Sequence, residues 1–184
     1  MPGPEPGSIL ARWKALGLPG DAPPRVLRSL RGGLSNRTWL VAAGTVRCVL
    51  RLPGEARMPG VDRQREARVL AAASAAGLAP PVYLHDVDAG VLVTGYVDAA
   101  GPASGPGFTA SLVRRLAQVH GLAGVVNAAP SYGALLADYE ARLAGNGRGA
   151  DEASARFAGQ MREQAAWLDA DTAGHGLCHH DPGP

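Results

Sequence analysis

The 184-residue sequence contains little cysteine, a single lysine and no long apolar run. Its two cysteines, Cys48 and Cys178, cannot build the disulfide framework of a small secreted domain. Seventeen of the 18 basic residues are arginines spread along the chain, so no basic cluster favours a nucleic-acid partner. No apolar run approaches the roughly 20 residues that span a bilayer, and the N-terminus lacks the features of a secretion signal. We therefore expect a cytoplasmic protein with no nucleic-acid or membrane partner, and the sequence does not indicate its oligomeric state.

The composition is that of a folded protein, with 46% hydrophobic and 18% charged residues. Alternating apolar residues from Thr45 to Leu52 predict a strand that buries Cys48 on one face and turns Arg51 to the other. By the same reasoning we expect strands at 25–31, 37–43, 45–52, 82–87 and 90–96, and helices at 8–16, 62–76, 109–122, 131–143 and 151–170. The predicted fold class is α+β: a small five-stranded antiparallel β lobe with one helix, followed by a partial helical lobe.

Domain boundaries follow from changes in composition. Residues 1–7 form a Pro/Gly-rich tail that we expect to be mobile, and Ser8 is the expected N-cap of the first helix. The β lobe is predicted at 8–96, and a Gly/Pro-rich link from 99 to 107 leads into the helical part, predicted at 97–184.

A glycine-rich turn lies between the first two predicted strands, at Gly32-Gly33-Leu34-Ser35-Asn36. Glycines in such a turn let the backbone approach a phosphate closely and direct N–H groups at it. The alternative is a plain hairpin turn, since glycine, serine and asparagine are ordinary turn residues. The turn matches neither a Walker A motif nor a dinucleotide-binding fingerprint, because a strand and not a helix follows it.

Arg51 near the end of the third strand and Glu66 in the following helix are a second candidate pair. Protein kinases place a lysine at this strand position, where it holds phosphates and pairs with a glutamate on the next helix. An arginine can supply the same fixed positive charge. Val49, on the same face as Arg51, is placed to meet an adenine ring. The alternative is ordinary surface charge.

The last residues, Leu177 to Pro184, contain His179 and Asp181 in the spacing of a kinase catalytic loop, H-x-D-x-x-x-x-N. In such a loop the aspartate accepts the proton of the attacking hydroxyl. The asparagine that would hold a metal ion falls five residues after Asp181, beyond the last residue of the sequence. A zinc site at His175, Cys178, His179, His180 and Asp181 is a weaker alternative, because adjacent ligands suit one tetrahedral ion poorly.

Taken in order, these motifs resemble the aminoglycoside phosphotransferase and choline kinase family, particularly its choline- and thiamine-kinase-like branch. The resemblance implies a protein-kinase-like fold and ATP-dependent transfer of the γ-phosphoryl group to a hydroxyl of a small, often cationic molecule such as choline, thiamine or an aminoglycoside. The matching segments are residues 30–39, 49–52, 65–70, 77–80 and 177–181.

The resemblance also implies roles for the site residues. The turn from Gly32 to Asn36 would cover the phosphates, and Arg51 with Glu66 would hold them. Gly95, Tyr96 and Val97 would form the hinge beside adenine. Asp181 would act as the base, with His179 supporting its loop. ATP and Mg²⁺ are the implied cofactors.

Both Mg²⁺ ligands of the family are missing from the sequence, so we expect a C-terminally truncated member, inactive by itself. The alternative is a short non-catalytic protein of the same fold that binds a nucleotide or a partner. Tyr132, Asp138, Tyr139 and Glu140 could line an entrance to a substrate pocket, but the helical spacing of Tyr132, Leu135, Leu136 and Tyr139 is more simply a packing face.

Overall fold

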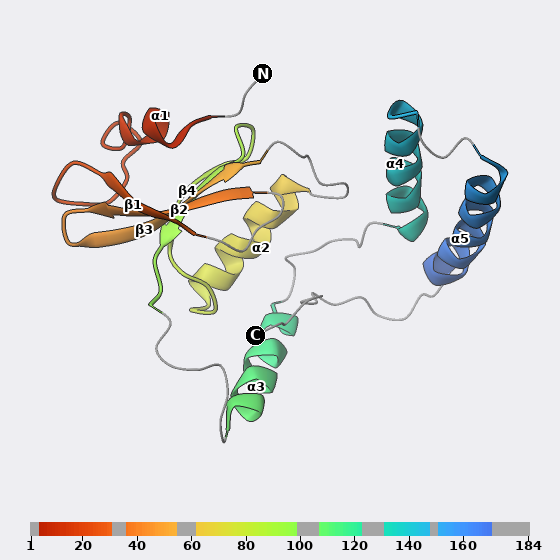
Figure 1. Cartoon of the computed structure of the whole chain (residues 1–184). Helices are drawn as coiled ribbons and strands as arrows, with labels where there is room; N and C mark the ends of the chain where they lie inside the picture. The colour runs from red at the N-terminus through yellow and green to blue at the C-terminus, as the bar shows by residue number, and fades with distance from the viewer. Residues whose placement is uncertain are drawn as a thin grey trace. The chain divides into compact units, whose positions relative to one another are not determined.

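The computed structural model describes residues 4–30, 36–54, 62–98, 107–122, 131–147 and 151–170 (Figure 1). Two compact units divide these residues, one holding 4–54 and 62–122 and the other 131–170. The division falls between residues 122 and 131 of the described chain. The elements are α1 (Pro6–Leu10), β1 (Arg25–Leu30), β2 (Asn36–Ala43), β3 (Val46–Pro53), α2 (Arg63–Ala75), β4 (Val82–Asp86), β5 (Val91–Gly95), α3 (Phe108–His120), α4 (Tyr132–Gly145) and α5 (Glu152–Ala170).

Five strands form one antiparallel sheet in the order β1-β2-β3-β5-β4. The predicted three-stranded meander and the later hairpin are both present, with each strand within two residues of its expected bounds. Gly44 has a φ of +68° in the turn between β2 and β3, a conformation that favours glycine. The predicted α+β class with a five-stranded antiparallel lobe is confirmed.

The first helix differs from its prediction. It begins at Pro6 with Glu5 as N-cap and ends at Leu10, whereas Ser8 was expected to cap a helix reaching Leu16. Proline suits the first helical turn because a backbone N–H at that position has no carbonyl partner within the helix, so its absence costs nothing. Ser8 instead lies inside the helix, where its hydroxyl donates to the Glu5 carbonyl at 2.7 Å.

The two faces of the sheet have different surroundings. One face, here called the core face, carries Cys48, Leu50 and Leu52 of β3, all fully buried. Ile9, Trp13 and Leu18 from the N-terminal segment pack into the same cluster with residues of the other strands. Burying a large apolar side chain stabilises a fold by about 1.5–3 kcal/mol. This cluster therefore holds the N-terminal segment on the sheet.

The opposite face, here called the Arg51 face, carries Val49 and Arg51 of β3, which are partly exposed. The helix α2 contacts β4, and its Glu66 reaches Arg51 on this face. The sheet therefore has the N-terminal segment on its core face and α2 on its Arg51 face, as the first unit in Figure 1 illustrates.

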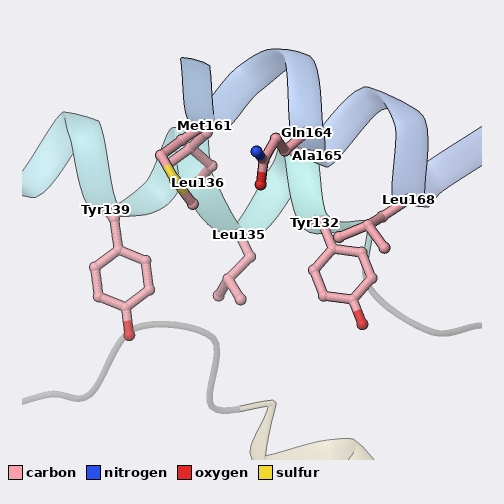
Figure 2. A pocket seen from close by; sticks show the side chains of 8 residues that line it. All are labelled: Tyr132, Leu135, Leu136, Tyr139, Met161, Gln164, Ala165 and Leu168. Atoms are coloured by element: carbon pink, nitrogen blue, oxygen red, sulfur yellow. The ribbon is translucent and has the colours of Figure 1, made fainter. Parts of the chain in front are cut away.

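The second unit consists of α4 and α5 packed against each other. Asp169 near the end of α5 accepts backbone N–H bonds from Tyr132 at 2.7 Å and Gly133 at 2.9 Å, which caps the start of α4. Tyr132 and Tyr139 point to the same side of α4, with Leu135 between them (Figure 2). These side chains line a shallow apolar groove together with Leu136, Met161, Gln164, Ala165 and Leu168. None of the helices within the described ranges is long and apolar enough to cross a membrane.

Candidate functional site

Four side chains from four strands form one row across the Arg51 face. The register pairs Thr38 with Arg51, Arg51 with Leu92, and Leu92 with His85. Directly opposed residues of antiparallel strands point to the same face, so Arg51 and His85 flank the buried Leu92. Their backbones lie two strand spacings apart, or roughly 10 Å. The sheet therefore presents a guanidinium and an imidazole on either side of an apolar residue.

The first turn of α2 brings a carboxylate to this row. Asp62 caps the helix by accepting a hydrogen bond from the backbone N–H of Arg65 at 2.9 Å, which fixes where the helix starts. Glu66 follows in that first turn and pairs through Oε1 with Arg51 Nη1 at 2.6 Å. Its other oxygen, Oε2, lies 4.0 Å from His85 Nε2. One carboxylate thus spans from the guanidinium to the imidazole.

The charges around this carboxylate change its acidity. Burial raises the pKa of Glu66, but the hydrogen bond and charge of Arg51, the charge of His85 when it is protonated at low pH, and the charge of Arg63 outweigh that effect. The net result is a pKa of Glu66 below its ordinary value, so the side chain is an anion at neutral pH. The Arg51–Glu66 pair is therefore a permanent feature of the site near neutrality.

Two polar atoms at the site are buried without a protein partner in the described part of the chain: Arg51 Nε and His85 Nδ1. Buried polar groups are normally hydrogen-bonded, so these two atoms mark a place where the described residues do not supply the usual partners. Arginine N–H groups match the geometry of phosphate oxygens, and the Arg51 side chain retains 22% of its exposure. Val49 and Thr94, opposite each other in the next row of the same face, are also partly exposed. The arrangement fits a phosphate group beside an apolar ring.

The segment that follows β5 is held by contacts to β3. Tyr96 donates its backbone N–H to the Arg47 carbonyl at 3.1 Å, and its ring lies 5.1 Å from the Arg47 guanidinium carbon. The same guanidinium pairs with Asp98 at 2.8 Å. Val97, between the two partners, is 65% exposed. Gly95, Tyr96 and Val97, predicted to form a hinge, therefore end β5 and begin an exposed segment anchored to β3.

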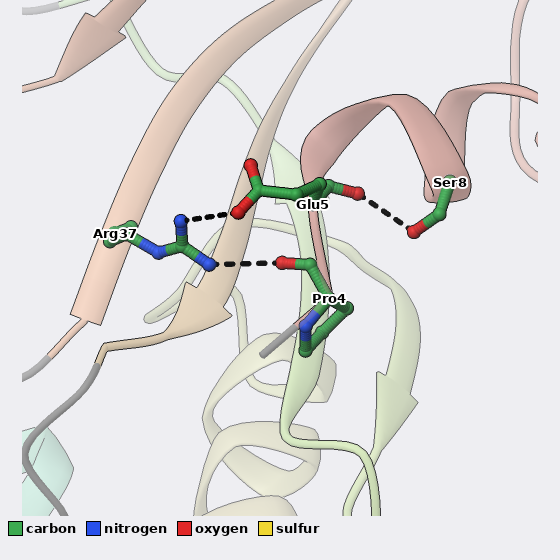
Figure 3. Close-up of polar contacts among 4 residues, drawn as sticks. All are labelled: Pro4, Glu5, Ser8 and Arg37. Atoms are coloured by element: carbon green, nitrogen blue, oxygen red, sulfur yellow. Dashed lines mark hydrogen bonds and ion pairs between the residues drawn. The ribbon is translucent and has the colours of Figure 1, made fainter. Parts of the chain in front are cut away.

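Arg37 follows the glycine-rich turn directly and lies on the core face. Its guanidinium pairs with the Glu5 carboxylate and donates to the Pro4 carbonyl, both at 3.0 Å (Figure 3). Residues 4–7, assigned from the sequence to a mobile tail, thus contact β2 and begin α1. Arg37 is therefore directed to the N-terminal segment, on the other face of the sheet from Arg51.

Several predicted site residues lie outside the described residues. Gly32, Gly33, Leu34 and Ser35 of the turn are among them, while Asn36 begins β2. His179 and Asp181 also lie outside, as does the alternative zinc cluster. Across the described ranges no group of three histidine, cysteine or acidic side chains is arranged to hold a metal ion. The structure therefore describes Arg51 and Glu66, and the predicted catalytic loop stays a prediction.

The candidate site residues drawn from the sequence do not include His85. The structure places it against Glu66, with its side chain only 10% exposed. No motif could have indicated this, because the contact depends on the β4–β5 register and on the position of α2. The packing interpretation of Leu135 and Leu136 agrees with the contacts of α4 and α5, yet Tyr132 and Tyr139 are 53% and 44% exposed beside the groove.

Comparisons with known proteins place this arrangement in context. The model of the phosphotransferase enzyme family matches residues 26–184. The crystal structure of choline kinase LicA from Streptococcus pneumoniae is similar with a TM-score of 0.58 and 20% identity, over 88% of this chain and 57% of that one. A choline/ethanolamine kinase family protein from Mesorhizobium loti has 29% identity and a TM-score of 0.47, over 72% of this chain and 45% of that one. No curated protein sequence matches significantly.

These findings confirm the resemblance drawn from the motifs and the protein-kinase-like fold. The similarity to the Streptococcus pneumoniae structure is one of fold, because so few residues are identical. This chain spans little more than half of that protein's length.

Proposed function

Since this chain belongs to the phosphotransferase enzyme family, we propose that it forms the nucleotide-binding part of an ATP-dependent small-molecule phosphotransferase. The observation that carries the proposal is the Arg51–Glu66 ion pair between β3 and α2. It joins a strand cation to a helix carboxylate on the face opposite the core cluster, and the Arg51 side chain keeps 22% of its surface exposed.

The physical role of such a pair is to hold the cation still. An arginine side chain loses several freely rotating torsions when it binds a phosphate, and a fixed carboxylate removes that cost before the ligand arrives. Glu66 is fixed in turn by the capped first turn of α2. Phosphoryl transfer depends mainly on positioning and charge neutralisation, so a pre-positioned cation at the phosphates serves both.

The other site residues take their proposed roles from the family resemblance. The turn from Gly32 to Asn36 covers the phosphates, Val49 meets the adenine ring, and Gly95 to Val97 lie beside that ring. Asp181 deprotonates the acceptor hydroxyl, with His179 supporting its loop. Mg²⁺ neutralises phosphate charge when bound, and the described residues supply no ligand set for it.

The proposed acceptor is a hydroxyl group on a small, often cationic molecule. Choline, thiamine and aminoglycosides are the candidates that the family resemblance supplies. The similar Streptococcus pneumoniae protein is a choline kinase, which makes choline a reasonable first acceptor to assay.

Nucleotide binding by the 184-residue chain tests the proposal directly. Titration with a fluorescent ATP analogue in the presence of Mg²⁺ should show saturable binding that unlabelled ATP displaces. Arg51→Ala should weaken binding at least tenfold, equivalent to about 1.4 kcal/mol. Glu66→Gln should weaken binding less, because the cation remains but is held less firmly. Arg156→Ala, in the exposed ion pair with Glu152 on α5, is the matched control and should bind as the wild type does.

Two results would count against this function. Absence of nucleotide binding by the folded wild type would remove its basis, and equal binding by the Arg51→Ala and Arg156→Ala variants would remove the role of the ion pair. Nucleotide binding without phosphate transfer fits both this function and the non-catalytic alternative, whereas phosphate transfer to a hydroxyl acceptor by the 184-residue chain would exclude the alternative.

A further inference from the structure

The Glu66 carboxylate is shared between two side chains that approach it from separate strands. Arg51 Nη1 lies 2.6 Å from Oε1, and His85 Nε2 lies 4.0 Å from Oε2. Arg51 comes from β3 and His85 from β4, on either side of Leu92 of β5. The two contacts therefore set the tilt of the carboxylate across the row, because each oxygen has its own neighbour.

His85 is surrounded by charges from three elements. Glu66 and Arg63 face it from α2, Arg51 from β3, and Asp86 is its own neighbour on β4. Burial lowers the pKa of His85, and the charges of Arg51 and Arg63 add to this, while those of Glu66 and Asp86 oppose it. The net pKa is below the ordinary value of 6.5, so the imidazole is neutral at pH 7.

The position of Arg63 shows why Glu66 and His85 lie close together. Its guanidinium occupies the space that a side chain on Gly90 would need, at the turn between β4 and β5. Gly90 also has a φ of +69°, which other residues adopt rarely. The first turn of α2 is thereby seated against the same hairpin that carries His85, so Glu66 and His85 are held at one end of the helix.

We propose that His85 is a positioning residue for the Arg51–Glu66 pair, one that confines the second Glu66 oxygen so that Arg51 keeps a fixed orientation toward the nucleotide phosphates. This inference rests on the proposed function and adds a third residue to its phosphate-holding site. At 4.0 Å the contact is longer than a hydrogen bond. Neutral His85 therefore acts through its bulk and its N–H dipole, and does not carry a charge that would compete with Arg51 for the carboxylate.

The electrostatic contacts among Arg51, Glu66 and His85 can be tested without any nucleotide. The titration of His85, followed by NMR of its ring protons in the 184-residue chain, should shift in opposite directions in two variants. Glu66→Gln removes a charge that favours the protonated ring, so the pKa of His85 should fall further. Arg51→Ala removes a charge that opposes protonation, so the pKa of His85 should rise. A His85 ring that lies away from the Arg51–Glu66 pair would show neither shift.

Nucleotide affinity tests the positioning role. His85→Ala should weaken binding of the fluorescent ATP analogue several-fold at pH 7, because the carboxylate gains freedom to rotate. His85→Gln places an amide nitrogen near the position of Nε2 and should retain affinity within about twofold of wild type, roughly 0.4 kcal/mol. His120→Ala, at the exposed end of α3, is the matched histidine control. Circular dichroism establishes that each variant is folded.

The outcomes separate this inference from the proposed function. Opposite pKa shifts together with weakened His85→Ala binding and retained His85→Gln binding support the positioning role. A His85 titration unchanged by Glu66→Gln overturns it. Weakened binding in Arg51→Ala with full affinity in His85→Ala also overturns it, while leaving the function intact. Opposite shifts of the His85 pKa without nucleotide binding would support the contacts of His85 with Glu66 and Arg51 and would remove the nucleotide function.

Discussion

Gly95 at the end of β5 and Pro81 before β4 are in direct backbone and side-chain contact. The Gly95 N–H donates to the Pro81 carbonyl at 2.9 Å, and a Cβ added at Gly95 would lie 2.9 Å from Pro81 Cγ and 3.1 Å from Cδ. Real Cβ atoms do not approach that closely, and a proline ring cannot rotate away. Packing at the end of the hairpin therefore explains the glycine, whether or not the segment beside it meets a ligand.

Replacement of Gly95 by alanine should destabilise the first unit by about 1–3 kcal/mol, as expected for overpacking. Gly159→Ala is the matched control, because nothing lies within 4 Å of the added Cβ in α5. There the substitution should stabilise the helix by about 0.5–1 kcal/mol. Urea unfolding followed by circular dichroism measures both. Equal effects of the two substitutions would contradict the packing explanation.

Leu50→Ala should be among the most destabilising single substitutions in the sheet. Leu50 is fully buried in the core cluster, and such truncations typically cost about 2–5 kcal/mol. Leu27→Ala on β1 is the comparison, since Leu27 is 42% exposed and should lose under about 1 kcal/mol. Tryptophan fluorescence during urea unfolding reports on the cluster through Trp13. Similar midpoints for the two variants would argue against the assignment of the core face.

Stability should fall in two separate ranges as the pH is lowered. The pKa of His85 is depressed in the folded state, so the unfolded chain binds the proton first and stability falls below about pH 6.5. The pKa of Glu66 is also depressed, so its contribution is present above the unfolded value near 4.5 and is lost as the pH falls through the folded pKa.

Urea midpoints measured between pH 7 and pH 3 distinguish the two groups. His85→Gln should flatten the upper range and leave the lower one, whereas Glu66→Gln should flatten the lower range most. The change of the urea midpoint with pH is compared and not the absolute stability, because Glu66→Gln also leaves Arg51 without its carboxylate. A wild-type stability that rises as the pH is lowered from 7 to 5 would contradict a depressed pKa of His85.

Asp169→Ala should loosen the start of α4 within the second unit. The carboxylate accepts two backbone N–H bonds there, and loss of such a cap costs about 1 kcal/mol. Amide hydrogen exchange at Tyr132 and Gly133 should become faster, while exchange in the middle of α5 changes little. Glu163→Ala on the exposed side of α5 is the control. Unchanged protection of both amides would show that α4 begins without help from Asp169.

The strands and the α2 helix were predictable from local patterns. The alternation from Val46 to Leu52 and the helix predicted over residues 62–76 depend on residues close together in the chain, and tertiary packing agrees with both. The start of α1 was not predictable in this way, because Pro6 and Ser8 both suit a helix N-terminus. The contacts of Pro4 and Glu5 with Arg37, 33 and 32 residues away, also hold this segment to β2.

The site was only partly predictable for a related reason. Arg51 and Glu66 could be found because kinase motifs fix their order along the chain. His85 could not, because its contact with Glu66 depends on a register shift between Val82 and Leu84 that no local pattern indicates. A β-bulge changes which side chains point to a given face, so pattern reasoning fails after it.

The N-terminal segment has a consequence for where this lobe begins. The region shared with the family starts at residue 26, yet Ile9, Trp13 and Leu18 lie before it and are buried against the sheet. A chain shortened to residues 26–184 would keep every residue of the proposed site and lose the layer that shields Cys48 and Leu50 from water. Contiguous exposed apolar surface of this kind drives aggregation. The shortened chain should therefore lose solubility before any effect on its chemistry could be measured. The segment needed for folding thus begins before residue 26, where the match to the family begins.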